Sequence, residues 1–182
     1  RLGLGLGLGL GFGLVLGLGP TVNALFALGE VVGWRGYLLW ELAPLGFWRA
    51  SFVIGALWGL WHAPVIIAGY NFPSFPYVGV VAMTVACLSF SPVYTYLVIR
   101  ANSVLAAALL HGVFNGSAGI VIVYAVTDDP VLDQLVASPV GLAGVLTFGL
   151  LGLGIALTGS PLLSRTGIEG PSSQPVEVGR SE

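Results

Sequence analysis

Residues 29–42 read GEVVGWRGYLLWEL and place a glutamate, Glu30, and an arginine, Arg35, in a mostly apolar stretch. No charged residue lies between Arg1 and Glu30. The same composition extends outward along the chain of 182 residues, which is 56% hydrophobic and 8% charged. A soluble domain has about 25% charged residues, so this chain cannot cover a surface that faces water. The sequence therefore predicts an integral membrane protein.

The apolar residues form segments that are separated by helix breakers and caps. A membrane-spanning helix needs about 20 apolar residues, and short connections with Pro, Asn and Ser divide the chain at suitable intervals. The pattern predicts an all-α, polytopic transmembrane helix bundle. About six spans are expected, and they are Leu2–Gly19, Pro20–Leu42, Phe47–Gly69, Val78–Ile99, Ser103–Val126 and Pro139–Leu157.

Four regions follow from this division. Residues 1–24 form a Gly/Leu-rich span and a turn, and residues 25–126 hold the polar groups that lie within spans. Residues 127–158 form an acidic loop and the last span, and residues 159–182 are a polar tail rich in Ser, Pro and Gly, which indicates disorder. In the first region, pairs such as Gly9/Gly13 can allow close helix packing, or they can be a compositional expansion without a specific role.

The arginines predict the orientation. They lie at the N-terminus, in the connections after the second and fourth spans, and after the sixth span, at Arg1, Arg49, Arg100 and Arg165. These places fall on one side of a six-span protein, and the other side carries the acidic segment 127–138. The positive-inside rule then places both termini in the cytoplasm of a multi-pass cell-membrane protein. A net charge of −2 without a basic stripe excludes nucleic acid as an expected partner and leaves membrane lipid.

Few polar side chains lie inside the predicted spans, and ionisable groups there indicate function. On a helix, His111 and Asn115 share one face, as do Trp58 and His62. With Glu30 from a third helix, these groups could activate a water molecule, the carboxylate acting as general base and His and Asn holding the carbonyl oxygen. The same Glu30, His62 and His111 could instead bind a metal such as zinc.

Each of these residues also has a structural interpretation. A single His or Asn can form a hydrogen bond that joins two helices, Trp58 can be a packing residue or an interfacial anchor, and Arg35 can hold a carboxylate. Spacing alone supports a polar intramembrane site and does not decide between hydrolysis and ion transport. No internal repeat of the kind common in transporters is visible, so transport ranks below hydrolysis.

Three motifs on three predicted spans resemble those of the CPBP family of intramembrane proteases, the CAAX-protease and bacteriocin-processing group. The motifs are EVVGWR from Glu30 to Arg35, WGLWHAP with Trp58 and His62, and HGVFN with His111 and Asn115. Their order and flanking residues match the family, and the resemblance covers about residues 25–120.

The resemblance implies an intramembrane endopeptidase whose protease core is residues 25–126. Glu30 and His62 match the positions thought to activate the attacking water, and His111 and Asn115 match those thought to stabilise the oxyanion or to bind metal. Arg35 and Trp58 are supporting residues. The substrate would be a peptide or protein, either prenylated or a bacteriocin-like precursor. A catalytically impaired relative that acts as a membrane scaffold or bacteriocin-immunity factor is the alternative.

One departure from the family pattern affects Arg35. Val31 occupies the position of the second glutamate in the first motif. Arg35 lies four residues after Val31, the spacing of a helical ion pair, but five after Glu30, which is about 140° around an α-helix. A buried arginine without a partner is costly. We therefore expect Arg35 to bind a backbone carbonyl, a residue of another helix or water.

Overall fold

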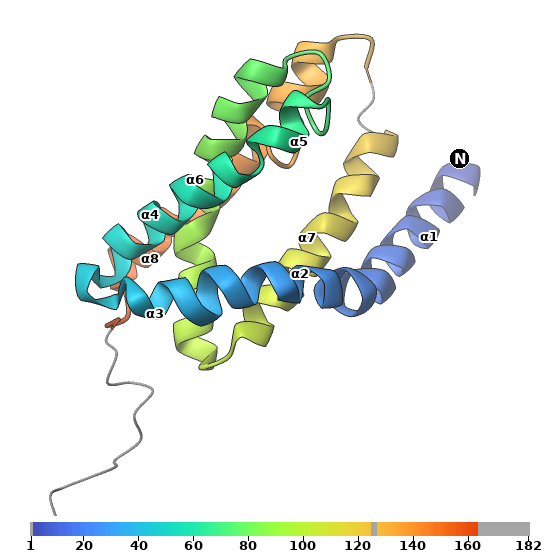
Figure 1. Cartoon of the computed structure of the whole chain (residues 1–182). Helices are drawn as coiled ribbons and strands as arrows, with labels where there is room; N and C mark the ends of the chain where they lie inside the picture. Colours follow the sequence, from blue (N-terminus) through green and yellow to red (C-terminus); the bar gives the residue numbers. More distant parts are fainter. Residues whose placement is uncertain (1, 125–126, 164–182) are drawn as a thin grey trace, which may run out of the picture.

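The structure, a computed structural model, describes residues 2–124 and 127–163. Within these ranges the chain is helical and contains no strand (Figure 1). The predicted disordered tail, apart from its first residues, lies outside the described ranges, as do Arg1 and Arg165. The helices are α1 (Leu2–Leu18), α2 (Ala24–Val31), α3 (Leu39–Glu41), α4 (Gly46–Trp61), α5 (Ala63–Ile67), α6 (Pro76–Ala101), α7 (Val104–Tyr124) and α8 (Leu142–Thr158).

The first three helices are joined by π-helical turns, η1 (Gly19–Asn23) between α1 and α2 and η2 (Val32–Leu38) between α2 and α3. Pro20 lies in the first turn of η1 and has no N–H for the hydrogen-bond ladder. The chain changes direction there, so that α2 runs away from α1 (Figure 1). A 3₁₀ turn, η3 (Ala43–Leu45), then leads into α4. Glu30 and Arg35 are thus carried by one continuous but irregular helical segment.

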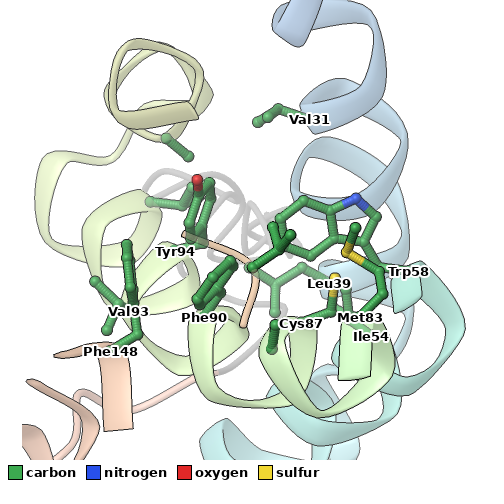
Figure 2. Packing of buried hydrophobic residues seen from close by; sticks show 14 of the residues in the cluster. Val31, Leu39, Ile54, Trp58, Met83, Cys87, Phe90, Val93, Tyr94 and Phe148 are labelled. Carbon is green, nitrogen blue, oxygen red and sulfur yellow. The ribbon is translucent and has the colours of Figure 1, made fainter. Parts of the chain in front are cut away.

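The remaining helices pack around this segment. Helix α6 lies against both α4 and α8, and α7 packs on α1, η1 and α2 as well as on α6. The buried side chains meet around α6, where Met83, Cys87, Phe90 and Tyr94 face Trp58 of α4 and Phe148 of α8 (Figure 2). The core therefore extends directly to residues of the predicted site.

Glycine permits the closest helix contacts, but not at Gly9 and Gly13 of the first span. A Cβ atom on Gly59 would lie 2.4 Å from the Cα of Thr84 on α6, and one on Gly112 would lie 2.2 Å from the carbonyl oxygen of Gly19. Any side chain at either position would push two backbones apart. Around Gly9 and Gly13 no atom lies within 4 Å of such a Cβ. Of the two interpretations of this glycine pair, close helix packing is not observed in the described chain, and a compositional expansion without a specific role remains.

Two helical segments are long and apolar enough to cross a membrane, Ala43–Ile67 and Pro76–Ala101. The apolar helices Val104–Ala118 and Leu142–Thr158 are shorter. An all-helical fold with long apolar helices is therefore confirmed in the described chain. Each predicted span coincides with a helical segment, but six membrane crossings remain a prediction.

Candidate active site

The carboxylate of Glu30 is held by Trp58. The indole Nε1–H of Trp58, on α4, donates a hydrogen bond to Oε1 of Glu30, at the end of α2. Trp58 is buried, with 4% of its surface exposed, while Glu30 is half-buried. Of the two structural roles considered for Trp58, its burial excludes an interfacial anchor. The indole fixes one carboxylate oxygen and leaves Oε2 for other contacts.

Trp58 also contacts both histidines, so it lies at the centre of the polar group. Its ring centroid is 6.1 Å from that of His62 and 5.5 Å from that of His111. The ring of Tyr94 on α6 contacts Trp58 and His111, with centroid distances of 5.5 Å and 5.9 Å. Side chains from α2, α4, α6 and α7 are thus brought together by one indole ring.

His62 lies at the junction where α4 ends and α5 begins. Pro64 cannot donate a backbone hydrogen bond, and the backbone N–H of His62 bonds to the carbonyl of Gly59 at 3.2 Å. The Nδ1 atom of His62 lies 2.8 Å from the carbonyl oxygen of Trp58. Because a carbonyl only accepts, Nδ1 must carry the proton, and Nε2 of the neutral ring then has a free lone pair. The backbone therefore sets this histidine as an acceptor, base or ligand.

His111 and Asn115 occupy one face of α7, as the spacing predicts. His111 is buried, with 6% of its surface exposed, and its Nδ1 has no hydrogen-bond partner among the described residues. Asn115, one turn later, is exposed. A buried ring nitrogen without a partner is costly and needs an explanation, of which a catalytic role is one.

Arg35 finds its partners on other helices, as predicted. It is buried, with 1% exposed, and its Nη2 donates to Oγ of Ser91 at 3.1 Å. Its guanidinium carbon lies 4.7 Å from the ring centroid of Trp58 and 5.3 Å from that of Tyr94. Val31, in place of the second glutamate, is buried in the apolar core. A hydroxyl group and two aromatic rings thus contact the cation.

The π-helical turn η2 begins two residues after Glu30 and contains Arg35. A separation of about 140° assumes α-helical geometry throughout, so it is approximate for this pair. Turns of this kind are frequent at functional sites. Glu30 and Arg35 both contact Trp58, one through the N–H and the other over the ring. The two charges are therefore linked through one indole.

The predicted catalytic residues line one cavity of about 820 Å³. Glu30, Trp58, His62, His111 and Asn115 all line it. Sequence reasoning missed further lining residues, which come from η1, from α6, from the loop after α5, and from the π-helical turn η4 (Val131–Val136) and the residues that follow it: Asn23, Met83, Cys87, Asn71, Asp133, Gln134 and Ser138. Among these residues, the sequence indicated only Asn23 as a candidate, because its side chain is an amide within an apolar span.

The metal prediction does not fit the described side chains as they are placed. Zinc sites need at least three protein ligands, usually His, Cys, Asp or Glu. In residues 2–124 and 127–163 no three such side chains lie together in a way that could hold a metal ion. A metal bound by Glu30, His62 and His111 therefore stays a prediction.

A bundle of apolar helices with a carboxylate, two imidazoles and an amide around an internal cavity defines a membrane-type protein with a buried polar site. Comparison with models of protein families matches residues 11–117, more than half of the chain, to the Rce1-like type II CAAX prenyl endopeptidases. The chain belongs to this family, which consists of membrane-embedded proteases. This confirms the resemblance to the CPBP group. No curated protein and no solved structure gives a match.

Proposed function

We propose that this protein is an intramembrane endopeptidase that hydrolyses a peptide bond with a water molecule activated by Glu30 and His62. The observation that carries the proposal is the convergence of Glu30, His62, His111 and Asn115 on one cavity in a chain of a protease family. These residues come from three helical regions that lie far apart in the sequence. If they only formed hydrogen bonds that join pairs of helices, they would not all need to line one cavity.

The chemistry follows from the atoms that remain available. Trp58 binds Oε1 of Glu30, so Oε2 takes a proton from water while Nε2 of His62 accepts the second hydrogen bond of that water. The hydroxide adds to the carbonyl carbon, and N–H groups of His111 and Asn115 bind the oxyanion. Glu30 then gives its proton to the amine as the C–N bond breaks, so the carboxylate is regenerated.

Arg35 supports this site without touching the substrate. It is packed between Trp58 and Tyr94, and Ser91, its hydrogen-bond acceptor, in turn donates to the carbonyl of Ser51 at 2.6 Å. This chain of contacts fixes the indole, and the indole fixes the carboxylate. Arg35 and Trp58 are therefore positioning residues in the proposal.

The substrate and the membrane arrangement are part of the same proposal. The substrate is a peptide or protein near lipid, for which prenylated CAAX proteins and bacteriocin-like precursors are the candidates. The chain crosses the cell membrane six times, with residues 25–126 as the protease core and both termini cytoplasmic. The positions of Arg49 and Arg100, in the first turn of α4 and the last turn of α6, support this orientation because they lie at the same end of the bundle.

A cleavage assay with purified protein tests the function. Glu30→Gln and His62→Ala should each lower the rate of peptide cleavage about 100-fold or more, the usual contribution of general acid–base catalysis. Asp128→Asn removes an exposed loop carboxylate and is the matched control, which should keep the wild-type rate. Cleavage at the wild-type rate by both Glu30→Gln and His62→Ala would contradict the mechanism.

The alternative is a catalytically impaired relative that acts as a membrane scaffold or bacteriocin-immunity factor. The observation that favours it is Val31, which removes a motif glutamate next to Arg35. Val31→Glu tests this alternative, because restoring the carboxylate should raise cleavage or stability if the missing partner limits the protein. An unchanged rate and melting temperature would count against the missing-partner account.

A further inference from the structure

Asn23 is a polar residue of the cavity wall that the catalytic proposal does not use. It is half-buried, it is the last residue of η1, and it lines the cavity beside α7. A Cβ atom on Gly116 would lie 3.3 Å from Nδ2 of Asn23, so the amide contacts α7 one residue after Asn115. The absence of a side chain at Gly116 leaves the space that this amide occupies.

The amide of Asn23 has neither of the structural roles that an asparagine in an apolar helix can have. Asn23 precedes the first residue of α2, but its backbone is helical and its side chain makes no cap hydrogen bond. It also forms no hydrogen bond with another residue in the ranges 2–124 and 127–163, so it does not join two helices. An amide is costly to place among apolar helices, and this one faces the cavity.

The polar lining is suited to the backbone of a peptide rather than to one sign of charge. The carboxylates of Glu30 and Asp133 belong to the lining, and the guanidinium of Arg35 lies 4.7 Å from the ring centroid of Trp58, which also lines the cavity. Charges of both signs therefore act on the cavity. The lining also contains imidazoles and hydroxyls, and its largest class of polar side chains is the carboxamides Asn23, Asn71, Asn115 and Gln134. A carboxamide carries both a donor and an acceptor, as the backbone of each substrate residue does.

Of the four carboxamides, Asn23 has no other contact or assigned role that uses its amide. Gln134 binds the backbone N–H and the hydroxyl of Ser74 at 3.0 and 2.9 Å, and Asn71 is exposed in the loop after α5. Asn115 binds the oxyanion in the proposed mechanism. The amide of Asn23 is therefore available to a second part of the substrate.

Asn23 and Glu30 lie on one face of the same helical segment. They are seven positions apart in the sequence, which is close to two α-helical turns and about 10 Å along the axis. Both line the cavity, as a shared face requires. A peptide in an extended conformation advances about 3.3 Å per residue. An extended substrate whose cleaved carbonyl group lies at Glu30 therefore brings a residue two or three positions away to Asn23.

We propose that Asn23 is a substrate-binding residue whose carboxamide pairs with the backbone N–H and C=O of one substrate residue, two or three positions from the cleaved bond. In an extended strand these two groups of one residue point to the same side, so Oδ1 accepts from the N–H and Nδ2 donates to the oxygen. Where that residue ends the chain, the oxygen belongs to its carboxylate. This inference rests on the proposed peptidase function and states how the site holds an extended substrate.

Backbone ester substitution tests this pairing. The probe is a fluorescently labelled eight-residue peptide that ends in a CAAX sequence with a farnesylated cysteine, and mass spectrometry locates the bond that wild type cleaves. In a series of such peptides, one backbone N–H at a time, apart from that of the cleaved bond, is replaced by an ester oxygen. One ester, two or three residues from the cleaved bond, should lower kcat/KM of wild type about tenfold, or about 1.4 kcal/mol, because Oδ1 of Asn23 loses its donor.

Variants of Asn23 assign the ester effect to this residue. In Asn23→Ala, and in Asn23→Leu with its similar side-chain volume, the same ester should change kcat/KM by less than about twofold, the limit of additive behaviour. Asn23→Asp keeps an acceptor oxygen at the same place and should retain the ester effect.

Thr21→Val is the matched control, because Thr21 lies in the same turn but outside the cavity lining, and its hydroxyl donates to the carbonyl of Gly17. This variant should respond to the ester as wild type does. An ester effect that is equal in wild type, Asn23→Ala and Asn23→Leu would overturn the inference. Wild type without an ester effect two or three residues from the cleaved bond would also overturn it.

Binding separates this inference from the proposed catalysis. Fluorescence anisotropy of the same ester series with His62→Ala protein in detergent measures affinity without cleavage. An ester at one position that weakens binding to His62→Ala, but not to the double variant with Asn23→Ala, supports the role of Asn23 even if wild type cleaves no peptide, which would contradict only the peptidase function. Equal ester effects on the two proteins at every position contradict the role of Asn23 whether or not cleavage occurs.

Discussion

The hydrogen bond between Trp58 and Glu30 predicts a measurable coupling free energy between the two side chains. Trp58→Phe removes the N–H that Glu30 accepts and keeps an aromatic ring against Arg35. A hydrogen bond to a charged group contributes about 1.5–3 kcal/mol in water-soluble proteins. Interhelical bonds in membranes average about 0.6 and reach about 1.7 kcal/mol. Because Trp58 is buried and Glu30 half-buried, we expect a coupling free energy of about 1–1.5 kcal/mol, above the membrane average and at or below the lower end of the range for charged groups.

A double-mutant cycle measures this coupling. The free energy of unfolding of wild type, Trp58→Phe, Glu30→Gln and the double variant is obtained by SDS titration in mixed micelles. Trp61→Phe is the matched control, because Trp61 lies on the same helix but is exposed and contacts Trp34 and His62. Its cycle with Glu30→Gln should be additive within about 0.3–0.5 kcal/mol. Equal coupling in both cycles would refute the assignment of Trp58 as the residue that holds Glu30.

Three further predictions concern packing, metal and orientation. Gly59→Val should lower the melting temperature strongly, because overpacking typically costs about 1–3 kcal/mol. Gly13→Val, the control, should leave the melting temperature almost unchanged. Equal shifts in the two variants would contradict the close contact of α4 with α6. Zinc added to chelator-treated protein should not raise the melting temperature, since no three described ligands lie together, and a clear rise would contradict this reading of the site. Asn71 and Asn102 are exposed residues with positive φ at opposite ends of the bundle. In a Cys87→Ala background, a membrane-impermeant maleimide added to intact cells should label Asn71→Cys but not Asn102→Cys. Labelling of Asn102→Cys alone would reverse the proposed orientation.

Helix identity and the choice of site residues could be predicted from the sequence because both depend on local properties. Long apolar segments divided by Pro and Asn indicate helices, and polar groups such as Glu30 and His62 stand out where the surrounding residues are apolar. The i, i+4 spacing of His111 and Asn115 correctly predicts a shared face, because α7 is a regular α-helix there.

The environment of Arg35 could not be predicted in the same way. Its hydrogen-bond acceptor, Ser91, lies 56 positions away in the sequence. Arg35 lies in the π-helical turn η2, and no residue pattern in GEVVGWR indicates such a turn. The close contacts at Gly59 and Gly112 likewise depend on which helices become neighbours.

The sequence by itself determined that this chain is helical and apolar and that its few buried polar groups are candidates for function. The physical reason is that a backbone in lipid must satisfy its own hydrogen bonds, and that a charge there is costly enough to be rare. Only the tertiary structure decided that Trp58 joins Glu30 to Arg35 and that Asp133, far away in the sequence, lines the same cavity as Glu30. Those contacts join residues that lie far apart along the chain, and their geometry is set by helix packing rather than by local spacing.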